Sequence, residues 1–230
     1  WSKMLIYNNV RQAKFLNRPN RFIANIELDG KQEACHVKNT CRCKELLVPN
    51  ATVYVQELES SKRKTKYDLI SVYKGRRLIN IDSQAPNKVF HNWVLETNFF
   101  KDVTLIKAEV KYKNSRFDYY IETLNSKIFV EVKGVTLEEN SVALFPDAPT
   151  ERGVRHIYEL ISSLEEGFEA WIVFIIQMEG IRYFTPNVKT HKEFGVALEE
   201  ARRRGVNIIA LDSIVTKESI KAGDFVKVKL

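Results

Sequence analysis

One segment, residues 116–133 (RFDYYIETLNSKIFVEVK), limits the possible folds of this chain more than any other. Its two halves, residues 116–122 and 127–133, are rich in β-branched and aromatic residues, which favour strands. Between them, Asn125 and Ser126 are typical turn residues, so the segment predicts a β-hairpin. We interpret the rest of the chain as the frame that holds this hairpin.

The alternation of side chains along the two strands places three charged groups together. If Leu124 pairs with Lys127, Asp118 lies opposite Lys133, and Glu131 lies two residues before Lys133 on the same strand. Because successive side chains point to opposite faces, Asp118, Glu131 and Lys133 then share one face. The other face carries an apolar set suited to a core: Phe117, Tyr119, Ile121, Val130 and Val132.

This charged face has two interpretations. Diagonal neighbours on paired strands lie roughly 7–8 Å apart, so two carboxylates can lean together around one divalent cation. Beside a lysine, such a cation can polarise a phosphoryl oxygen and activate a water. The alternative is a ladder of ion pairs on a solvated face, which is the commoner arrangement in an arbitrary hairpin.

The composition is that of a basic protein. Its 230 residues, 44% of them hydrophobic, suffice for one large or two small domains, and the formal net charge of +7 predicts an anionic partner. No apolar run is long enough to span a bilayer and residues 1–10 lack a signal-peptide pattern, so we expect a cytoplasmic protein. Three basic clusters favour nucleic acid over a membrane surface: Lys62, Arg63, Lys64 and Lys66; Arg76 and Arg77; and Arg202–Arg204.

The three cysteines do not form a recognisable zinc motif. Cys35, Cys41 and Cys43 are an odd number, and no second pair follows at zinc-finger spacing. His36 lies nearby and would be the fourth ligand of such a site. Reduced, partly buried thiols are the better interpretation.

Residues 1–85 are predicted to form a small all-β domain. Strands are expected at residues 22–28, 32–37, 51–58 and 67–73, a series that favours an OB-like β-barrel. Barrels of this type often bind single-stranded nucleic acid, and the basic residues 62–66 fall in a loop between two of the strands. Three tyrosines are candidates either for stacking on bases or for the core: Tyr54, Tyr67 and Tyr73.

Residues 86–230 are predicted to form an α/β domain in the order α-β-β-β-α-β. The apolar spacing predicts a first helix over residues 87–100, and a strand over 103–112 precedes the hairpin. Thr150 is the expected N-cap of a second helix that ends at Gly167. The remaining predictions are a strand buried on both faces at 171–176, a helix at 191–204, a strand at 206–211 and an edge strand at 224–230.

This order resembles the core of the restriction-endonuclease-like superfamily. Its motif is an aspartate, a variable gap and then Asp/Glu-x-Lys, which here corresponds to Asp118 followed by Glu131, Val132 and Lys133. The proline that usually precedes the aspartate is Phe117 in this chain. The resemblance implies that Asp118, Glu131 and the Val132 carbonyl bind Mg²⁺ or Mn²⁺ while Lys133 positions or activates a water.

Four stretches in both halves of the chain resemble the sugar fermentation stimulation protein (SfsA) family. They are HVKNTCRCKELL (36–47), EVKYKNSRFDYYI (109–121), VEVKGVTL (130–137) and FPDAPTERGVRHIYEL (145–160). The resemblance implies an N-terminal OB-type barrel joined to a nuclease-like domain. It also implies a DNA-binding protein linked to the regulation of sugar utilisation. Cys41 and Cys43 replace the Gly and Met expected from the family, which further disfavours zinc.

Five further residues are site candidates. Glu96 matches a position where superfamily relatives often supply another metal-binding carboxylate, but an exposed helical glutamate explains it equally well. Gln177 follows the buried strand and is either a catalytic polar group or an ordinary strand-end residue. At the start of the second helix, Arg152, Arg155 and His156 are candidates for phosphate contact, with His156 a possible proton carrier; in the alternative, Asp147 and Arg152 brace the loop.

Two classes of function follow from these residues. The first is a metal-dependent phosphodiesterase that acts on DNA or RNA, with DNA the expected partner. The second is a DNA-binding regulator that keeps the nuclease fold without turnover. A carboxylate pair repels phosphate unless a cation lies between them, which favours the first class.

Overall fold

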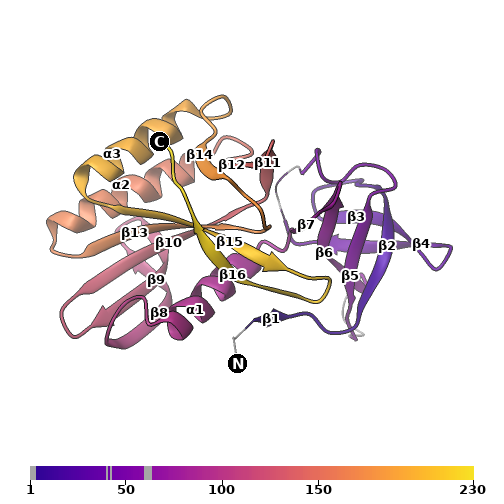
Figure 1. Ribbon diagram of the computed structural model, residues 1–230, viewed down its shortest axis with the longest axis horizontal. Coiled ribbons are helices and arrows are strands. Elements are labelled where there is room, and N and C mark those ends of the chain that lie inside the picture. The colour runs from indigo at the N-terminus through magenta and orange to yellow at the C-terminus, as the bar shows by residue number, and fades with distance from the viewer. Residues whose placement is uncertain (1–3, 40, 42, 60–63) are drawn as a thin grey trace.

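The computed structural model describes residues 4–39, 41, 43–59 and 64–230. Two bodies are visible in Figure 1: an N-terminal β-barrel, and a larger α/β domain with helices on both faces of its main sheet. An OB-like barrel followed by a restriction-endonuclease-like α/β domain is therefore confirmed. None of the helices in the described part of the chain is long and apolar enough to cross a membrane.

The barrel closes on itself through one parallel contact. Its strands are β2 (Val10–Asn17), β3 (Ile23–Leu28), β4 (Lys31–Val37), β5 (Thr52–Glu57) and β6 (Tyr67–Lys74), to which β7 (Arg77–Asn80) adds an edge. They pair in the order β4-β3-β2-β5-β6-β7, and a parallel pairing between β4 and β6 closes the ring. Asp29 and Gly30 form the turn between β3 and β4, and both residues have a positive φ. β2 and β7 were not predicted.

The main sheet of the second domain has seven strands. They are β1 (Leu5–Ile6), β8 (Val103–Tyr112), β9 (Ser115–Thr123), β10 (Lys127–Val135), β13 (Glu169–Ile176), β15 (Asn207–Val215) and β16 (Ser219–Val226), in the order β1-β16-β15-β13-β10-β9-β8. The pairings of β13 with β10 and with β15 are both parallel. Because β13 lies between two strands and under helices on both faces, its run of apolar residues is almost completely buried.

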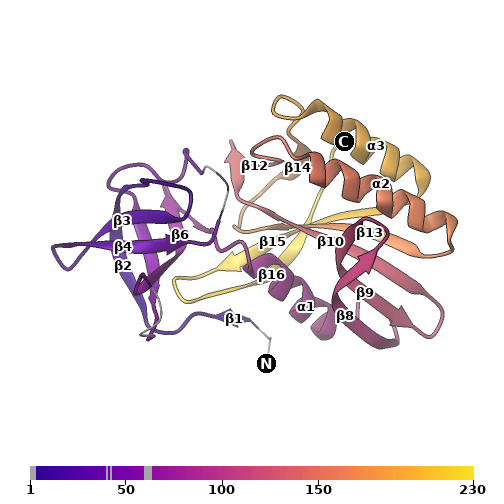
Figure 2. The same cartoon turned by 180° about the vertical axis from the view of Figure 1, so that it is seen from behind.

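Three helices cover the sheet. Helix α1 (Ala85–Thr97) lies on one face, while α2 (Glu151–Glu165) and α3 (Lys192–Arg204) lie on the other (Figures 1 and 2). As predicted, Thr150 caps α2, because its hydroxyl oxygen accepts a hydrogen bond from the Gly153 amide at 3.0 Å. A second, unpredicted sheet consists of β11 (Leu137–Glu139), β12 (Val142–Phe145) and β14 (Tyr183–Pro186).

The prediction for the two ends of the chain was wrong in detail. The edge strand expected at residues 224–230 begins earlier, as β16 at Ser219, and pairs antiparallel with β15. β1 pairs antiparallel with β16, so these first residues belong to the α/β sheet although they were assigned to the barrel domain. The pairing of β1 with β16 could not be inferred from local pattern, because these strands are distant in sequence, whereas β15 and β16 are consecutive strands that form a hairpin.

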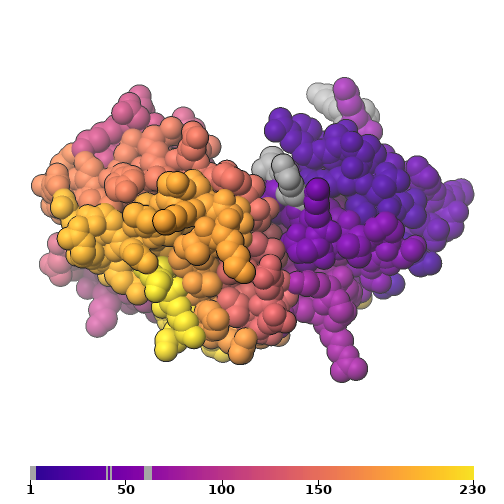
Figure 3. Space-filling view, turned by 90° about the horizontal axis from the view of Figure 1, so that it is seen from above, coloured from indigo at the N-terminus to yellow at the C-terminus, as the bar shows by residue number. Residues whose placement is uncertain are grey.

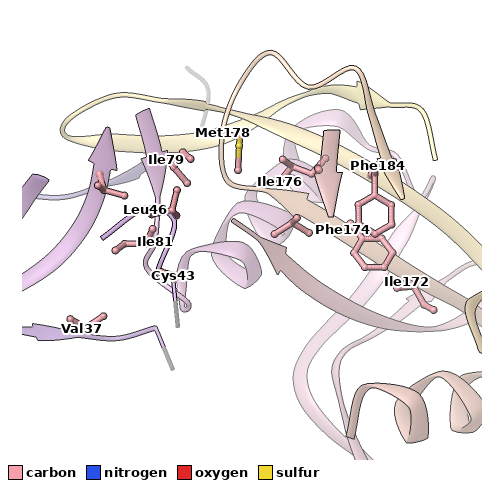
Figure 4. Close-up of a cluster of buried hydrophobic side chains, with 14 of the residues drawn as sticks. Val37, Cys43, Leu46, Ile79, Ile81, Ile172, Phe174, Ile176, Met178 and Phe184 are labelled. Atoms are coloured by element: carbon pink, nitrogen blue, oxygen red, sulfur yellow. The ribbon is translucent and has the colours of Figure 1, made fainter. Parts of the chain in front are cut away.

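The two bodies share part of their hydrophobic core. Figure 4 shows Ile79 and Ile81 from the barrel facing the end of β13, where Ile176 lies two residues before Met178. A buried carboxylate adds polar contacts, since Glu138 of β11 pairs with Lys74 and Arg77 of the barrel, each at 2.9 Å. The space-filling view shows the resulting waist between the two bodies (Figure 3).

Candidate metal-dependent nuclease site

The central hairpin forms with a register that differs from the predicted one. Lys127 pairs with Glu122 and Val130 with Tyr119, a shift of two residues from the expected pairing of Lys127 with Leu124. Asp118 is consequently level with Glu131 rather than with Lys133. Because the side-chain period of a strand is two residues, this shift does not separate the three charged groups.

The apolar set of the hairpin is divided between two faces, contrary to expectation. Tyr119 lies in the core cluster that contains residues of α1, whereas Phe117 belongs to the cluster that contains residues of α2. The ring of Phe117 lies 5.1 Å from that of Phe129, a residue of the same second cluster. The simple alternation of β9 is thus interrupted between Phe117 and Tyr119, which is the position of Asp118.

Asp118 is held by two donors that orient both of its oxygens. Its Oδ2 accepts a hydrogen bond from the Val132 amide at 2.8 Å, and its Oδ1 accepts one from the Asn87 side-chain amide at 2.9 Å. Burial, together with the charge of Glu131 and against that of Lys133, raises the pKa of Asp118 from 3.8 to about 6. Asn87, in the first turn of α1, is a site residue that the sequence analysis missed.

Glu131 is a buried carboxylate in which one oxygen has partners and the other has none among the described residues. Its Oε1 contacts Lys133 Nζ at 2.5 Å and His156 Nδ1 at 2.6 Å. Burial acts to raise the pKa of Glu131, but the adjacent Lys133 and His156 outweigh it, so the pKa is lowered and the group is an anion. Its Oε2 is buried and has no hydrogen-bond partner among the described residues.

His156 serves as a buried support for Glu131. Arg152 donates from Nε to His156 Nε2 at 3.3 Å, which requires a lone pair on that nitrogen. Nδ1 is then the ring nitrogen that donates a hydrogen bond to Glu131 Oε1. His156 is 2% exposed, so it faces the carboxylate rather than solvent, whereas Arg155 is exposed on the outer side of α2.

The residues present fit a divalent cation bound mainly by oxygen. The unpartnered Glu131 Oε2 and the two oxygens of Asp118 provide carboxylate ligands at the same end of the hairpin. Within the described ranges, no group of three His, Cys, Asp or Glu side chains could hold a metal. Mg²⁺ commonly uses one or two carboxylates and keeps several waters, so a two-carboxylate site meets its requirements.

Gln177 lies at the junction of the two bodies. It is 1% exposed and donates from Nε2 to Asn80 Oδ1 at 2.8 Å and to the Asp82 carbonyl at 3.0 Å. A Cβ at Gly134, the residue after Lys133, would lie 2.7 Å from Gln177 Oε1. Gln177 therefore approaches the strand that carries the cluster, with its amide donors bound to the barrel.

Glu96 is not brought to this cluster. It lies nine residues beyond Asn87 on α1, which corresponds to about 13.5 Å along the helix axis. Its side chain is exposed near the opposite end of that helix. The residue of α1 that contacts Asp118 is Asn87.

The basic loop of the barrel is only partly described. Lys62 and Arg63 lie outside the described residues. Lys64 is exposed and lines an open groove of about 650 Å³ with His36, Lys38 and Gln84, the last of which is the N-cap of α1. Lys66 pairs with Glu57 at 2.5 Å, so its charge is partly compensated within the barrel.

The three cysteines are free thiols, as the sequence analysis favoured. Cys35 and Cys43 are buried and Cys41 is partly buried. Burial raises the pKa of each thiol, to about 12 for Cys35 and Cys43. The thiols are therefore protonated at neutral pH in the metal-free protein.

Comparison with known proteins identifies both parts of the chain. Residues 16–81 match the family model described as the SfsA N-terminal OB domain, and residues 84–219 match the sugar fermentation stimulation protein RE domain. Sugar fermentation stimulation protein homologs from Clostridium beijerinckii and Desulfitobacterium hafniense are 60% and 62% identical over 97% of this chain, covering 99% and 98% of those proteins.

A solved structure shows the same architecture. SfsA of Pyrococcus furiosus in complex with Ca²⁺ superposes with a TM-score of 0.90 at 30% sequence identity, over 99% of both chains. The agreement therefore includes the barrel, the α/β domain and their junction. On the strength of both domain models and these near-full-length relatives, the chain belongs to the sugar fermentation stimulation protein family.

Proposed function

We propose that this protein binds DNA and cleaves phosphodiester bonds at the cluster of Asp118, Glu131 and Lys133 with the aid of a divalent cation, Mg²⁺ or Mn²⁺. The observation that carries this proposal is the buried Glu131 Oε2, which has no hydrogen-bond partner among the described residues. An unpaired buried anionic oxygen is costly unless something outside the chain compensates it. A cation shared with Asp118 supplies that compensation.

The chain's own groups have separate tasks in this proposal. When bound, the cation would polarise a phosphoryl oxygen and lower the pKa of a water. Lys133, half-buried beside Glu131, can position the attacking water or offset negative charge as it develops on the phosphate. Asn87 and the Val132 amide fix the Asp118 carboxylate, and His156 does the same for Glu131.

Two further observations support a cation and a nucleic-acid partner. The Pyrococcus furiosus SfsA structure was determined in complex with Ca²⁺, an ion that shares oxygen ligands with Mg²⁺. The net charge of +7 and the exposed Lys64 suit a polyanion. We assign the groove of Lys64, together with Arg152 and Arg155 at the start of α2, to backbone phosphates.

One observation favours a second function, a DNA-binding regulator of sugar-utilisation genes that does not cleave. The ammonium of Lys133 lies 2.5 Å from Glu131, so the cluster is already partly neutralised without a metal. A protein of this kind would bind DNA through the same surfaces and leave the strand intact. The two functions differ only in turnover.

The decisive experiment combines a cleavage assay with a binding assay. Labelled single- and double-stranded DNA are incubated with Mg²⁺ or Mn²⁺ and with the wild-type protein, Asp118→Ala, Lys133→Ala or Lys189→Ala. The last variant, at an exposed position between β14 and α3, is the control for a lost positive charge. We expect metal-dependent cleavage by the wild type and Lys189→Ala, and DNA binding without cleavage by the two site variants. Binding without cleavage by every protein in either metal would establish the regulator instead.

A further inference from the structure

A second, open groove lies on the barrel away from the carboxylate cluster. Its volume is about 840 Å³, and it is bounded by strands β5 to β7 on one side and by the turn between β15 and β16 on the other. Figures 1 and 2 both show the β15–β16 hairpin extending toward the barrel. None of the lining residues belongs to the cluster of Asp118, Glu131 and Lys133.

The wall formed by the barrel is aromatic. Tyr54 of β5 and Tyr73 of β6 line the groove, with ring centroids 6.1 Å apart and ring planes tilted by 60°. Both side chains are half-buried, so each ring packs on the barrel and also faces the groove. Leu78 of β7 adds an apolar surface beside them. Such rings can stack on the faces of bases whatever their sequence.

The groove is positively charged on balance, because its four basic residues outnumber its one carboxylate, that of Glu179. Arg76 is exposed in the turn between β6 and β7 and forms no ion pair with the described residues. Lys217, in the turn after β15, lies across the groove and is 62% exposed, with only a long 3.5 Å contact to Glu218. Lys74 and Arg77 contribute less, because both pair with the buried Glu138.

We propose that this groove binds a single-stranded segment of nucleic acid, with bases stacked on Tyr54 and Tyr73 and phosphates near Arg76 and Lys217. The inference rests on the nucleic-acid binding of the proposed function. It adds that the bound segment is single-stranded and that it contacts a second surface. A duplex does not meet these requirements, because its bases stack on each other and do not offer their faces to a side chain. An OB barrel commonly binds oligonucleotides on its second and third strands, whereas this groove uses the last two strands and β7.

The groove is connected through β7 to the junction that holds Gln177, and it shares no residue with the candidate active site. Strand β7 begins at Arg77 in the groove and ends at Asn80, which binds Gln177; three residue steps of a strand span about 10 Å. A strand held in the groove is therefore anchored beside the junction from which Gln177 approaches the cluster. The two sites have different residues, so each can be altered without touching the other.

The test measures the affinity for a fluorescent oligo(dT) by anisotropy in EDTA, where no metal-dependent cleavage occurs. Tyr73→Leu keeps an apolar side chain but removes the stacking face, while Arg76→Glu and Lys217→Glu reverse exposed charges without disturbing the core. Matched controls are Tyr158→Leu on α2 and Lys192→Glu on α3, both at exposed positions outside the groove. Circular dichroism confirms the folding of each variant.

We expect Tyr73→Leu to bind oligo(dT) about tenfold more weakly and Lys217→Glu to reduce the dependence of affinity on salt, with both controls unchanged. Affinity for a hairpin duplex should change far less in Tyr73→Leu. The proposal would be overturned if all three groove variants bound oligo(dT) with wild-type affinity. It would also be overturned if they lost as much affinity for the duplex as for the single strand. Loss of cleavage in Asp118→Ala with normal oligo(dT) binding tests the proposed function separately.

Discussion

Asp118 combines two properties that bear on metal binding: its carboxylate is oriented by two donors and its pKa is raised to about 6. In the unfolded chain the same group has a pKa of about 3.9. A proton and a cation therefore compete for Asp118 within the pH range in which the protein can be studied. Cation binding is therefore expected to depend on pH, and this dependence can be measured without a cleavage assay.

We predict that Mn²⁺ stabilises the wild-type protein above pH 7 and that this stabilisation disappears as the pH falls through 6. The sign follows because the cation requires the ionised carboxylate, which is lost below the raised pKa of Asp118. Thermal unfolding with and without Mn²⁺ at a series of pH values measures the effect. Asp118→Asn should show no Mn²⁺ effect at any pH, and a wild-type shift of the same size at pH 5 would contradict the prediction.

His156 gives a second prediction at this scale. His156→Phe keeps a ring but removes the donor to Glu131, a hydrogen bond between buried groups, so we expect a loss of about 1–3 kcal/mol in the free energy of unfolding. Urea denaturation measures the loss. The control is Arg155→Ala, one position earlier on α2 and exposed, which should change stability by less than about 0.5 kcal/mol. Equal stabilities of the two variants would exclude His156 as a support for Glu131.

At the scale of single elements, β10 and α1 approach each other unusually closely at Gly134. A Cβ there would lie 2.6 Å from Pro86 Cγ and 2.7 Å from Gln177 Oε1, distances that require the neighbours to shift. We predict that Gly134→Ala destabilises the protein by about 1–3 kcal/mol, as overpacking does in other cores. Chemical denaturation beside Lys88→Ala, an exposed change on α1, measures this. If Gly134→Ala left the free energy of unfolding unchanged, Pro86 and Gln177 would be able to move away from the added methyl group without cost.

The elements also show what the sequence could and could not predict. The helix N-cap at Thr150 and the span of β8 followed from local chemistry, because capping residues and strand composition act within a few positions. The hairpin register did not: the Thr123 hydroxyl accepts hydrogen bonds from the amides of Asn125 and Ser126, which begins the turn earlier than expected. The charged residues are nevertheless close together, because Asp118 accepts a hydrogen bond from the Val132 amide, which lies between Glu131 and Lys133 on β10.

The site residues divide in the same way. Asp118, Glu131 and Lys133 lie within one hairpin, so their proximity could be predicted from a short motif. Asn87 depends on where the first turn of α1 packs against β9, and no spacing in the sequence specifies that contact. Glu96 was chosen by analogy with the superfamily, and the direction of α1 takes it to the other end of the helix.

At the scale of the whole molecule, the barrel and the α/β domain are expected to unfold together. They share buried apolar residues (Figure 4), and Glu138 is a buried anion with partners on the barrel. Removing one member of such an arrangement leaves the others without compensation.

We therefore predict that Glu138→Ala lowers the free energy of unfolding by about 3 kcal/mol. The control is Glu139→Ala, the exposed neighbour, which should have little effect. Denaturation followed by circular dichroism and by tryptophan fluorescence measures both the loss and its cooperativity. Two separate transitions in the wild-type protein would show that the bodies unfold independently.

The pairing of β1 with β16 has a mechanical consequence. The chain passes from the α/β sheet into the barrel after β1 and returns before α1, so the barrel is attached by two backbone tethers instead of one. A body on a single tether can swivel in any direction, whereas two neighbouring tethers permit rotation only about the line that joins them. Any opening between the barrel and the sheet is thus confined to a hinge rotation about that line. A nucleic-acid strand bound to both bodies would restrain this rotation.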